Sequence, residues 1–317
     1  MSEIMVTVLC VTYNHKDYIA RCIDGIISQK TQYKFEMIVH DDASTDGTTE
    51  IVKEYEKKYP EIIRGIYENE NQYSKGIDIV ERFLLPKVKG RFVANCDGDD
   101  EWIDPYKMQK QVDFMLDHPN VLACTTNALV KDCRTNKEYN YCNWKRSKYV
   151  SVNDVLWGEK AIIKPSTWII RAKPLIQSKD EISKLGGYSD VHIQFWMLAS
   201  GKIYYMKDVT IIYRLYVPGS WSSTSTDSYE DKLLRIERFN ELTEYRYDRK
   251  IRRKINKSVY RRLNNEREME LLSIIGGRRI LLSGCVDIAL AVLLNNMCPS
   301  IYCYIRRIWR KIIHETE

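Results

Sequence analysis

The sequence predicts a doubly wound α/β domain, with a mostly parallel sheet flanked by helices. Short apolar runs rich in β-branched residues alternate with stretches of helical periodicity as far as about residue 130, and their connections are short. Three of the apolar runs end in polar or acidic residues. Such sheets bind ligands at the carboxyl ends of their strands. The sequence therefore predicts a ligand site at one edge of the sheet.

The elements of this first part follow one another in regular order. The predicted strands cover residues 5–12, 35–40, 62–67 and 92–96, and the predicted helices cover 17–28, a stretch capped by Asp46, 77–85 and a stretch opened by Asp104-Pro105. From residue 121 the pattern becomes α+β. Further strands are expected at 121–130, 161–171, 203–206 and 209–214, and residues 132–149 are expected to form a polar, aromatic surface loop.

Composition limits the class of protein. The 317 residues are 44% hydrophobic and 29% charged, as in ordinary globular proteins, and suffice for one large domain plus an appendage, or for two domains. The nine cysteines form no CxxC pair and often lie inside apolar runs, which favours reduced thiols over disulfides or a zinc site. No signal peptide is expected. No apolar run reaches the roughly 20 residues that a helix needs to span a bilayer. These features favour a cytoplasmic protein.

The segment 91–102, RFVANCDGDDEW, is the clearest chemical feature. An apolar run leads directly into Asp97, Gly98, Asp99 and Asp100. Like charges this close repel one another, and a hard cation, or a polyphosphate held through it, is the usual reason to keep them together. Asp and Gly clusters are also common in plain turns and helix caps. Both interpretations stay open on this segment alone.

Three motifs taken together resemble the inverting glycosyltransferases of family 2. They are VTYN at 11–14, HDDASTDGT at 40–48 and CDGDDEW at 96–102, and the resemblance covers roughly residues 4–225. It implies a GT-A fold and a nucleotide-diphosphate sugar as donor. The expected organisation is a GT-A domain at 1–228, with a nucleotide-binding half at about 1–130 and an acceptor half at about 131–228. Residues 229–317 are expected to form a helical, basic C-terminal region.

The resemblance also implies roles for individual residues. Asp99, with Asp97, is expected to bind Mn²⁺ or Mg²⁺ and so to stabilise the leaving diphosphate. Tyr13 offers a flat surface for a uridine base, and Asp42 an acceptor for its ring N–H, although Asp41 and Asp42 also fit as caps of the next turn. Asp100 is left unassigned. The expected nucleotide-binding residues are Thr12, Tyr13, Asn14, Asp42, Asp97, Gly98 and Arg214.

An inverting transfer also needs a base for the acceptor hydroxyl. Asp190 precedes a helix-like stretch, as the base does in the family, and it fits a helix N-cap equally well. Asp180 and Glu181 are weaker candidates. The stretch from Tyr213 resembles the family's YRxH motif, but Tyr216 stands where many relatives carry His, which puts a further metal or phosphate ligand in doubt. Acceptor-side candidates are Trp102, Trp168 and Trp221. Trp102 also fits an anchor of the loop after the acidic segment, and Trp168 also fits core packing.

The C-terminal tail is basic. Residues 246–317 hold 16 Lys and Arg against 7 Asp and Glu. Ile301, Ile305, Ile308 and Ile312 fall on one helical face, with basic residues on the other. This pattern fits a helix on an anionic membrane surface, near a lipid-linked acceptor, and equally a packed helix with a solvated face. Nucleic-acid binding is not expected, because no recognised motif supports it.

Together these features predict an inverting, metal-dependent glycosyltransferase. It would move a sugar from a nucleotide-diphosphate sugar, a UDP-sugar first of all, to a saccharide or lipid-linked hydroxyl in cell-surface polysaccharide synthesis. Its expected place is the cytoplasm, or the cytoplasmic face of the membrane. One alternative is a nucleotidyltransferase acting on sugar phosphates, although residues 5–15 lack its Gly- and Arg-rich loop. The other is a non-catalytic, membrane-docked binding subunit, against which the four carboxylates Asp42, Asp97, Asp99 and Asp190 argue.

Overall fold

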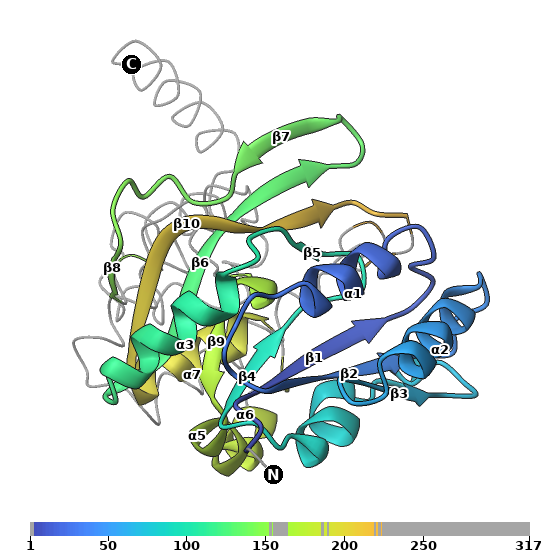
Figure 1. The fold of residues 1–317 in the computed structure, drawn as a ribbon, viewed down its shortest axis with the longest axis horizontal. Helices are drawn as coiled ribbons and strands as arrows, with labels where there is room; N and C mark the ends of the chain where they lie inside the picture. Colours follow the sequence, from blue (N-terminus) through green and yellow to red (C-terminus); the bar gives the residue numbers. More distant parts are fainter. Residues whose placement is uncertain are drawn as a thin grey trace, which may run out of the picture. The chain divides into compact units, whose positions relative to one another are not determined.

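A computed structural model describes residues 3–151, 154, 164–184, 187–188, 190–218, 220 and 223. Its strands form one sheet in the order β3-β2-β1-β4-β9-β6-β10-β5, while β7 pairs with β6 and β8 with β10 (Figure 1). The strands are β1 Val6–Thr12, β2 Phe35–Asp41, β3 Ile63–Tyr67, β4 Phe92–Asn95, β5 Glu101–Trp102, β6 Val121–Asp132, β7 Lys137–Asn140, β8 Lys148–Val150, β9 Ile169–Arg171 and β10 Lys202–Leu215.

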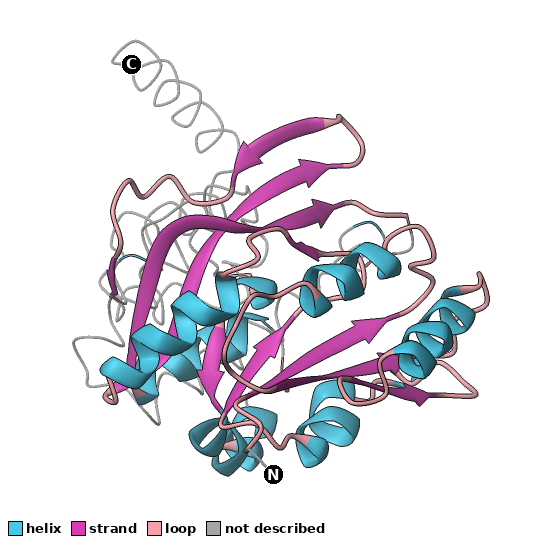
Figure 2. Ribbon diagram, viewed as in Figure 1, coloured by secondary structure: helices cyan, strands magenta, loops and turns pink. Residues whose placement is uncertain are grey.

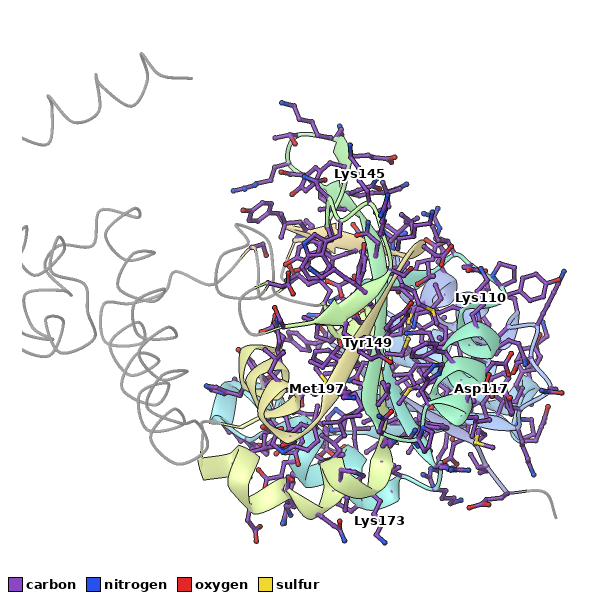
Figure 3. The ribbon with its side chains drawn as sticks, turned by 90° about the vertical axis from the view of Figure 1, so that its left-hand side faces the viewer. Lys110, Asp117, Lys145, Tyr149, Lys173 and Met197 are labelled. Carbon is purple, nitrogen blue, oxygen red and sulfur yellow. The ribbon has the colours of Figure 1, made fainter. Side chains whose placement is uncertain are left out.

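Helices cover both faces of this sheet (Figure 2). In Figure 3, α3, marked by Lys110 and Asp117, and α7, marked by Met197, lie on opposite sides of β6 and β10. The α-helices are α1 Ile19–Ile27, α2 Thr48–Lys58, α3 Lys107–Asp117, α5 Ala172–Gln177, α6 Lys179–Lys184 and α7 Asp190–Ser200. Four short helical turns complete the set: η1 Tyr73–Lys75, η2 Val80–Leu84, η3 Leu85–Lys87 and η4 Pro165–Thr167.

The predicted fold class is confirmed. Strands β3, β2, β1 and β4 pair in parallel, as β6 and β10 do. Strand β9 is antiparallel to both β4 and β6, so β6 and β10 run in the direction of the first four strands. Strands β1 and β2 are buried along nearly their whole length. Helix α1 packs its apolar face, with Ile19, Ile23 and Ile26 fully buried, into the same core.

The second half differs from the sequence prediction in three places. In the described part of the strand expected at 161–171, Pro165–Thr167 forms the 3₁₀ turn η4, and strand β9 begins only at Ile169. The strands expected at 203–206 and 209–214 are one strand, β10, which bends and shifts register between Tyr205 and Val209 (Figure 1). The expected loop at 132–149 contains β7 and most of β8. Those short strands are polar and largely exposed, so they lack the alternating apolar residues that reveal a strand in sequence.

Smaller differences concern helix ends. The helix expected at 77–85 is a single π-helical turn, η2, followed by the 3₁₀ turn η3. Helix α2 is capped by Gly47, whose φ is 104°, rather than by Asp46. The Asp46 carboxylate still accepts a hydrogen bond from the N–H of Thr48, the first residue of α2, at 3.0 Å. It therefore satisfies a free N–H group of the first helical turn, although it precedes the cap residue by one position.

The predicted domain boundaries stay predictions. Residues 224–317, including the basic tail, lie outside the described residues, as does Trp221. The expected division near residue 130 falls inside β6, which runs without interruption from Val121 to Asp132. No helix in the described part of the chain is long and apolar enough to cross a membrane.

A lysine is buried in the core between α3 and the sheet. Lys107 is 0% exposed, and its Nζ donates hydrogen bonds to Gln111 Oε1 at 2.6 Å and to the Thr167 carbonyl at 3.3 Å. The same Nζ lies 4.2 Å from the ring centroid of Trp102. Burial lowers the pKa of Lys107 to about 7. The site therefore opposes the charged form of this side chain near neutral pH.

Lys107→Met should change how stability depends on pH. Above about pH 7 folded Lys107 loses its proton, whereas the unfolded chain keeps it to about pH 10.4, so this group makes stability rise by up to about 1.4 kcal/mol per pH unit between those values. The variant should lack this rise in urea denaturation at pH 7, 8 and 9. Lys110→Met, which removes a half-exposed lysine of the same helix, should keep it. Equal slopes in both variants would contradict the assignment.

Candidate active site

The three motifs of the first half meet at one edge of the sheet. Strand β1 lies between β2 and β4, and Thr12 stands opposite Asp41 in the parallel register. Beyond the strands, the N–H of Asp42 donates to the Thr12 carbonyl at 3.0 Å, and the N–H of Gly98 donates to the Val11 carbonyl at 2.9 Å. The strand ends that the sequence marks as polar are therefore joined directly by backbone hydrogen bonds.

Gly98 allows the acidic segment to lie against the end of β1. A Cβ added at Gly98 would come within 2.5 Å of Thr12 Oγ1 and 2.8 Å of His15 Nδ1, closer than van der Waals contact allows. His15 is one of the residues that sequence reasoning missed. Its Nδ1 lies 3.2 Å from Thr12 Oγ1, and its Nε2 lies 3.9 Å from Asp99 Oδ2. The imidazole thus links the first motif to the third.

The carboxylates of the acidic segment have different surroundings. Burial, followed by the charges of Asp99 and Asp190, raises the pKa of Asp97 to about 7. Asp100 is only 2% exposed, and burial and its acidic neighbours raise its pKa well above the usual range. It accepts hydrogen bonds from Ser166 Oγ at 2.5 Å and from the N–H of Arg214 at 3.2 Å. Asp100 therefore has structural partners, whereas the expected role of Asp97 and Asp99 at a ligand stays a prediction.

The two aspartates of the second motif have different partners: Asp41 caps a turn, and Asp42 binds the backbone of a loop. Asp41 accepts hydrogen bonds from the N–H of Ser44 at 3.1 Å and from the Thr49 hydroxyl, so it caps the turn into α2. Asp42 is 1% exposed, and its two carboxylate oxygens accept from the N–H groups of Gln72 and Tyr73 at 2.7 and 3.0 Å. The expected base-contacting carboxylate therefore also fixes the connection after β3.

The first and second motifs are also joined by Asn14. Its N–H donates to Ser44 Oγ at 2.9 Å, and its Oδ1 accepts from the N–H of Thr45 at 2.8 Å. Asn14 has a positive φ of 56°, and Ala43 has one of 65°. Left-handed backbone at non-glycine residues is uncommon and concentrates at functional sites. The side chain of Tyr13 beside them is 38% exposed, open to a flat ligand.

Asp190 is the first residue of α7 and lies close enough to Asp97 to raise its pKa. Its Oδ2 is 3.8 Å from Nζ of Lys164, a second residue that sequence reasoning missed. The turn before α7 is anchored by a third missed residue, Asp78, which accepts a hydrogen bond from the N–H of Tyr188 at 2.6 Å. Asp78 and Tyr188 are far apart in sequence, so no local pattern reveals this contact.

Arg214 lies against the backbone of the acidic segment. Its guanidinium donates to the Asp99 carbonyl at 2.9 Å and to Glu101 Oε2 at 2.6 Å, and the residue is 5% exposed. Its expected role at a phosphate stays a prediction. Tyr216, which follows β10, has a φ of 62°, and the Arg134 guanidinium lies 3.1 Å from its ring centroid. An arginine thus occupies the face of the tyrosine found in place of the family's histidine.

Two of the tryptophans proposed for the acceptor side are core residues. Trp102 and Trp168 are each 3% exposed. Trp102 belongs to the main apolar cluster, and Trp168 Nε1 donates to Asn95 Oδ1 at 3.0 Å. Their burial agrees with the packing alternative and leaves almost no surface of either ring for a saccharide.

Within the part of the chain that the structure describes, no three His, Cys, Asp or Glu side chains are grouped so as to hold a metal ion. Asp97 and Asp99 do offer hard oxygen donors, which suit Mg²⁺ or Mn²⁺, and their mutual repulsion appears in the raised pKa of Asp97. The pair fits such a cation only if further ligands come from outside the protein. Substrate phosphate and water oxygens are the usual supplement.

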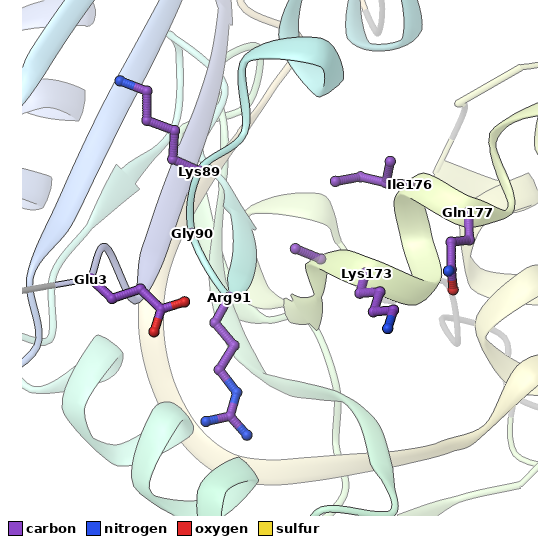
Figure 4. A pocket seen from close by; sticks show the side chains of 8 residues that line it. Glu3, Lys89, Gly90, Arg91, Lys173, Ile176 and Gln177 are labelled. Carbon is purple, nitrogen blue, oxygen red and sulfur yellow. The ribbon is translucent and has the colours of Figure 1, made fainter.

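A shallow pocket of about 330 Å³ lies elsewhere, beside the amino end of β4 (Figure 4). It is lined by Gly90 and Arg91 before β4 and by residues of α5, including Lys173 and Ile176. None of the residues expected at the nucleotide, metal or base positions lines it. The strand ends at the opposite side of the sheet remain the candidate active site.

Comparisons with known proteins bear on the family and the fold of this chain. An uncharacterized protein of Mycobacterium tuberculosis (strain H37Rv) is 30% identical over 70% of this chain and 62% of its own length. The putative teichuronic acid biosynthesis glycosyltransferase TuaG of Bacillus subtilis is 35% identical over 40% of this chain and 48% of its own. The UDP-Glc:alpha-D-GlcNAc-diphosphoundecaprenol beta-1,3-glucosyltransferase WfaP of Escherichia coli is 32% identical over 35% of this chain and 41% of its own length.

These matches span less than two thirds of the relatives' own lengths. Among solved structures, S. aureus TarS 1-349 in complex with UDP-GlcNAc superposes with a TM-score of 0.57 at 15% identity, covering 93% of this chain and 92% of that one. This likeness concerns the fold. The model for "Glycosyl transferase family 2" matches residues 7–178, more than half of the chain. The chain therefore belongs to glycosyl transferase family 2.

Proposed function

We propose that this protein is an inverting glycosyltransferase that uses a nucleotide-diphosphate sugar, a UDP-sugar first of all. One observation carries the proposal: the carboxylates of Asp97 and Asp99 in the acidic segment and of Asp190 in α7 act electrostatically on one and the same side chain, that of Tyr213. Burial and the charges of all these carboxylates, with Asp100, raise the pKa of the Tyr213 hydroxyl. The segment after β4, helix α7 and strand β10 thus contribute groups that influence one another, and we place the meeting of donor and acceptor among them.

The nucleotide would bind at the ends of β1 and β2. Tyr13 presents its exposed ring to the base, and Asp42 lies in the neighbouring strand end. The Asp42 oxygens already accept two backbone N–H groups, but a carboxylate has about four lone-pair sites and keeps capacity for a further donor. Thr12, Asn14 and Gly98 shape the backbone here. Asp42 would therefore read the base while it keeps the adjoining loop in place.

The diphosphate would lie beside Asp97 and Asp99, together with a divalent cation. Mn²⁺ or Mg²⁺ would offset the phosphate charge and stabilise the departing diphosphate as a Lewis acid. Asp99, with Asp97, would hold the cation, and diphosphate oxygens would complete its ligands. Arg214 would act here mainly by fixing the Asp99 carbonyl.

The proton of the acceptor hydroxyl would pass to Asp190. A base must come within hydrogen-bond reach of the proton it removes, and helix α7 sets the backbone position of Asp190, its first residue. The attack would come from the α7 side while the diphosphate leaves on the Asp99 side. Such an arrangement, with base and leaving group on opposite sides of the sugar carbon, leads to inversion in a single displacement.

The acceptor would be a saccharide hydroxyl, free or lipid-linked, in the synthesis of a cell-surface polysaccharide. The name of TuaG refers to teichuronic acid, and that of WfaP to an acceptor on diphosphoundecaprenol. A lipid-linked acceptor would place the reaction at the cytoplasmic face of the membrane. The basic tail, which lies outside the described residues, supplies cationic residues suited to such a surface.

Asp99→Ala should abolish release of nucleoside diphosphate in an assay with donor, acceptor and Mn²⁺. The substitution removes the carboxylate that we assign to the cation, while the buried contacts of Asp100 stay in place. Asp208→Ala, at an exposed position of β10, serves as the control and should keep its activity. Full activity of Asp99→Ala with metal present would refute the metal assignment. Release of pyrophosphate instead would favour a nucleotidyltransferase.

The donor can be identified by thermal stabilisation. A ligand that binds the folded protein raises its apparent stability, by about 2.7 kcal/mol at 100 times its dissociation constant. Among UDP- and GDP-sugars, a UDP-sugar should give the largest rise in melting temperature, and only with Mn²⁺ or Mg²⁺ present. The Asp42→Asn variant should lose most of this rise. A larger rise with GDP-sugars would overturn the choice of nucleotide. If no UDP- or GDP-sugar raised the melting temperature, the proposed function itself would be overturned.

A further inference from the structure

Lys164 is the one cation that an ion-pair contact brings to the proposed base within the described part of the chain. Its Nζ lies 3.8 Å from Asp190 Oδ2, beyond hydrogen-bond length but within ion-pair range. The same Nζ lies 4.5 Å from the ring centroid of Tyr213 and 5.6 Å from that of Tyr141. Two aromatic faces and one carboxylate therefore surround this ammonium group.

The backbone of Lys164 is firmly held. Its carbonyl accepts hydrogen bonds from the N–H of Thr167 at 2.9 Å and from Thr167 Oγ1 at 2.6 Å. Thr167 Oγ1 also lies 2.7 Å from Thr125 Oγ1 of β6. Pro165 follows Lys164 and restricts it to the extended conformation observed, with φ −70° and ψ 139°. The backbone of Lys164 is therefore fixed relative to the sheet, and its side chain extends from that position.

Burial makes the pair stronger than a surface ion pair. The side chains of Lys164 and Asp190 are 15% and 33% exposed, so water and salt screen their attraction only in part. Asp190 faces repulsion from the acidic segment, because its charge helps to raise the pKa of Asp97, whereas Lys164 acts in the opposite direction on the same group. Lys164 therefore offsets part of the repulsion between Asp190 and the acidic segment.

We propose that Lys164 is a positioning residue, which holds the Asp190 carboxylate where it receives the proton of the acceptor. This inference rests on the proposed function of the site. It differs from a direct role at the donor, because the ammonium group of Lys164 contacts Asp190, Tyr213 and Tyr141, whereas it acts on Asp97 through its charge. Loss of the ammonium group should therefore slow the chemical step and leave donor binding intact.

The test compares Lys164→Met with Lys164→Arg in the full-length protein. Lys164→Met should lower kcat by roughly 10- to 100-fold, the size expected for losing one interaction of a charged group, with donor KM changed less than about twofold. Lys164→Arg keeps the charge and the aromatic contacts and should recover most of kcat. Donor affinity measured by calorimetry with Mn²⁺ should be unchanged in both. The control Lys53→Met removes an exposed lysine 5.0 Å above the Tyr67 ring and should behave as wild type.

A double-mutant cycle with Asp190→Asn distinguishes the possible outcomes. If Lys164 acts through Asp190, Lys164→Met should cause no further loss in the Asp190→Asn background. A full additional loss there, or weaker donor binding, would overturn the inference in favour of a direct role at the diphosphate. Should Lys164→Met fail to fold, a Lys164→Arg variant with less than a tenth of wild-type kcat would equally overturn it. Full activity of Asp190→Asn would instead refute the proposed base.

Discussion

The buried carboxylate of Asp100 is the contact on which the rest of the site depends. It accepts hydrogen bonds from Ser166 Oγ in the turn before β9 and from the N–H of Arg214 in β10. A buried carboxylate without partners would cost several kcal/mol, so these bonds strongly favour one arrangement of the three segments. Asp97 and Asp99 belong to the same short segment as Asp100, so these bonds also limit the positions that their backbone can take. The residue left unassigned from sequence is therefore the structural centre of the acidic segment.

Crowding of like charges around this centre explains the cationic residues nearby. Lys164 approaches from the turn that also carries Ser166, and Arg214 approaches from β10. Each lies beside a carboxylate outside the Asp97–Asp99 pair, namely Asp190 or Glu101. The pair itself keeps its repulsion, which a bound cation would relieve. Lys164 and Arg214 thus offset carboxylates at the periphery, while the raised pKa of Asp97 reflects the repulsion that the proposed cation would relieve.

The sequence predicted those parts of the site whose signals are local. Strand, polar end and helix follow one another within a few residues, so β1, β2, β4 and their motifs could be identified, as could Asp190 at the start of α7. His15, Asp78 and Lys164 could not, because each acts on a partner distant along the chain or on a different motif. Residue type alone also gave no information about whether Trp102 and Trp168 were buried. Only packing decides that.

Arg214 illustrates how a correct motif can carry an unexpected contact. The motif predicted a guanidinium near phosphate, and the structure directs it to the Asp99 carbonyl and to Glu101. Both contacts are charge-assisted and nearly buried, so a direct phosphate contact would have to displace Glu101 or use the remaining N–H groups. By holding the backbone of Asp99, Arg214 fixes the carboxylate assigned to the cation. Its positive charge can therefore favour the diphosphate from a distance without leaving its structural partners.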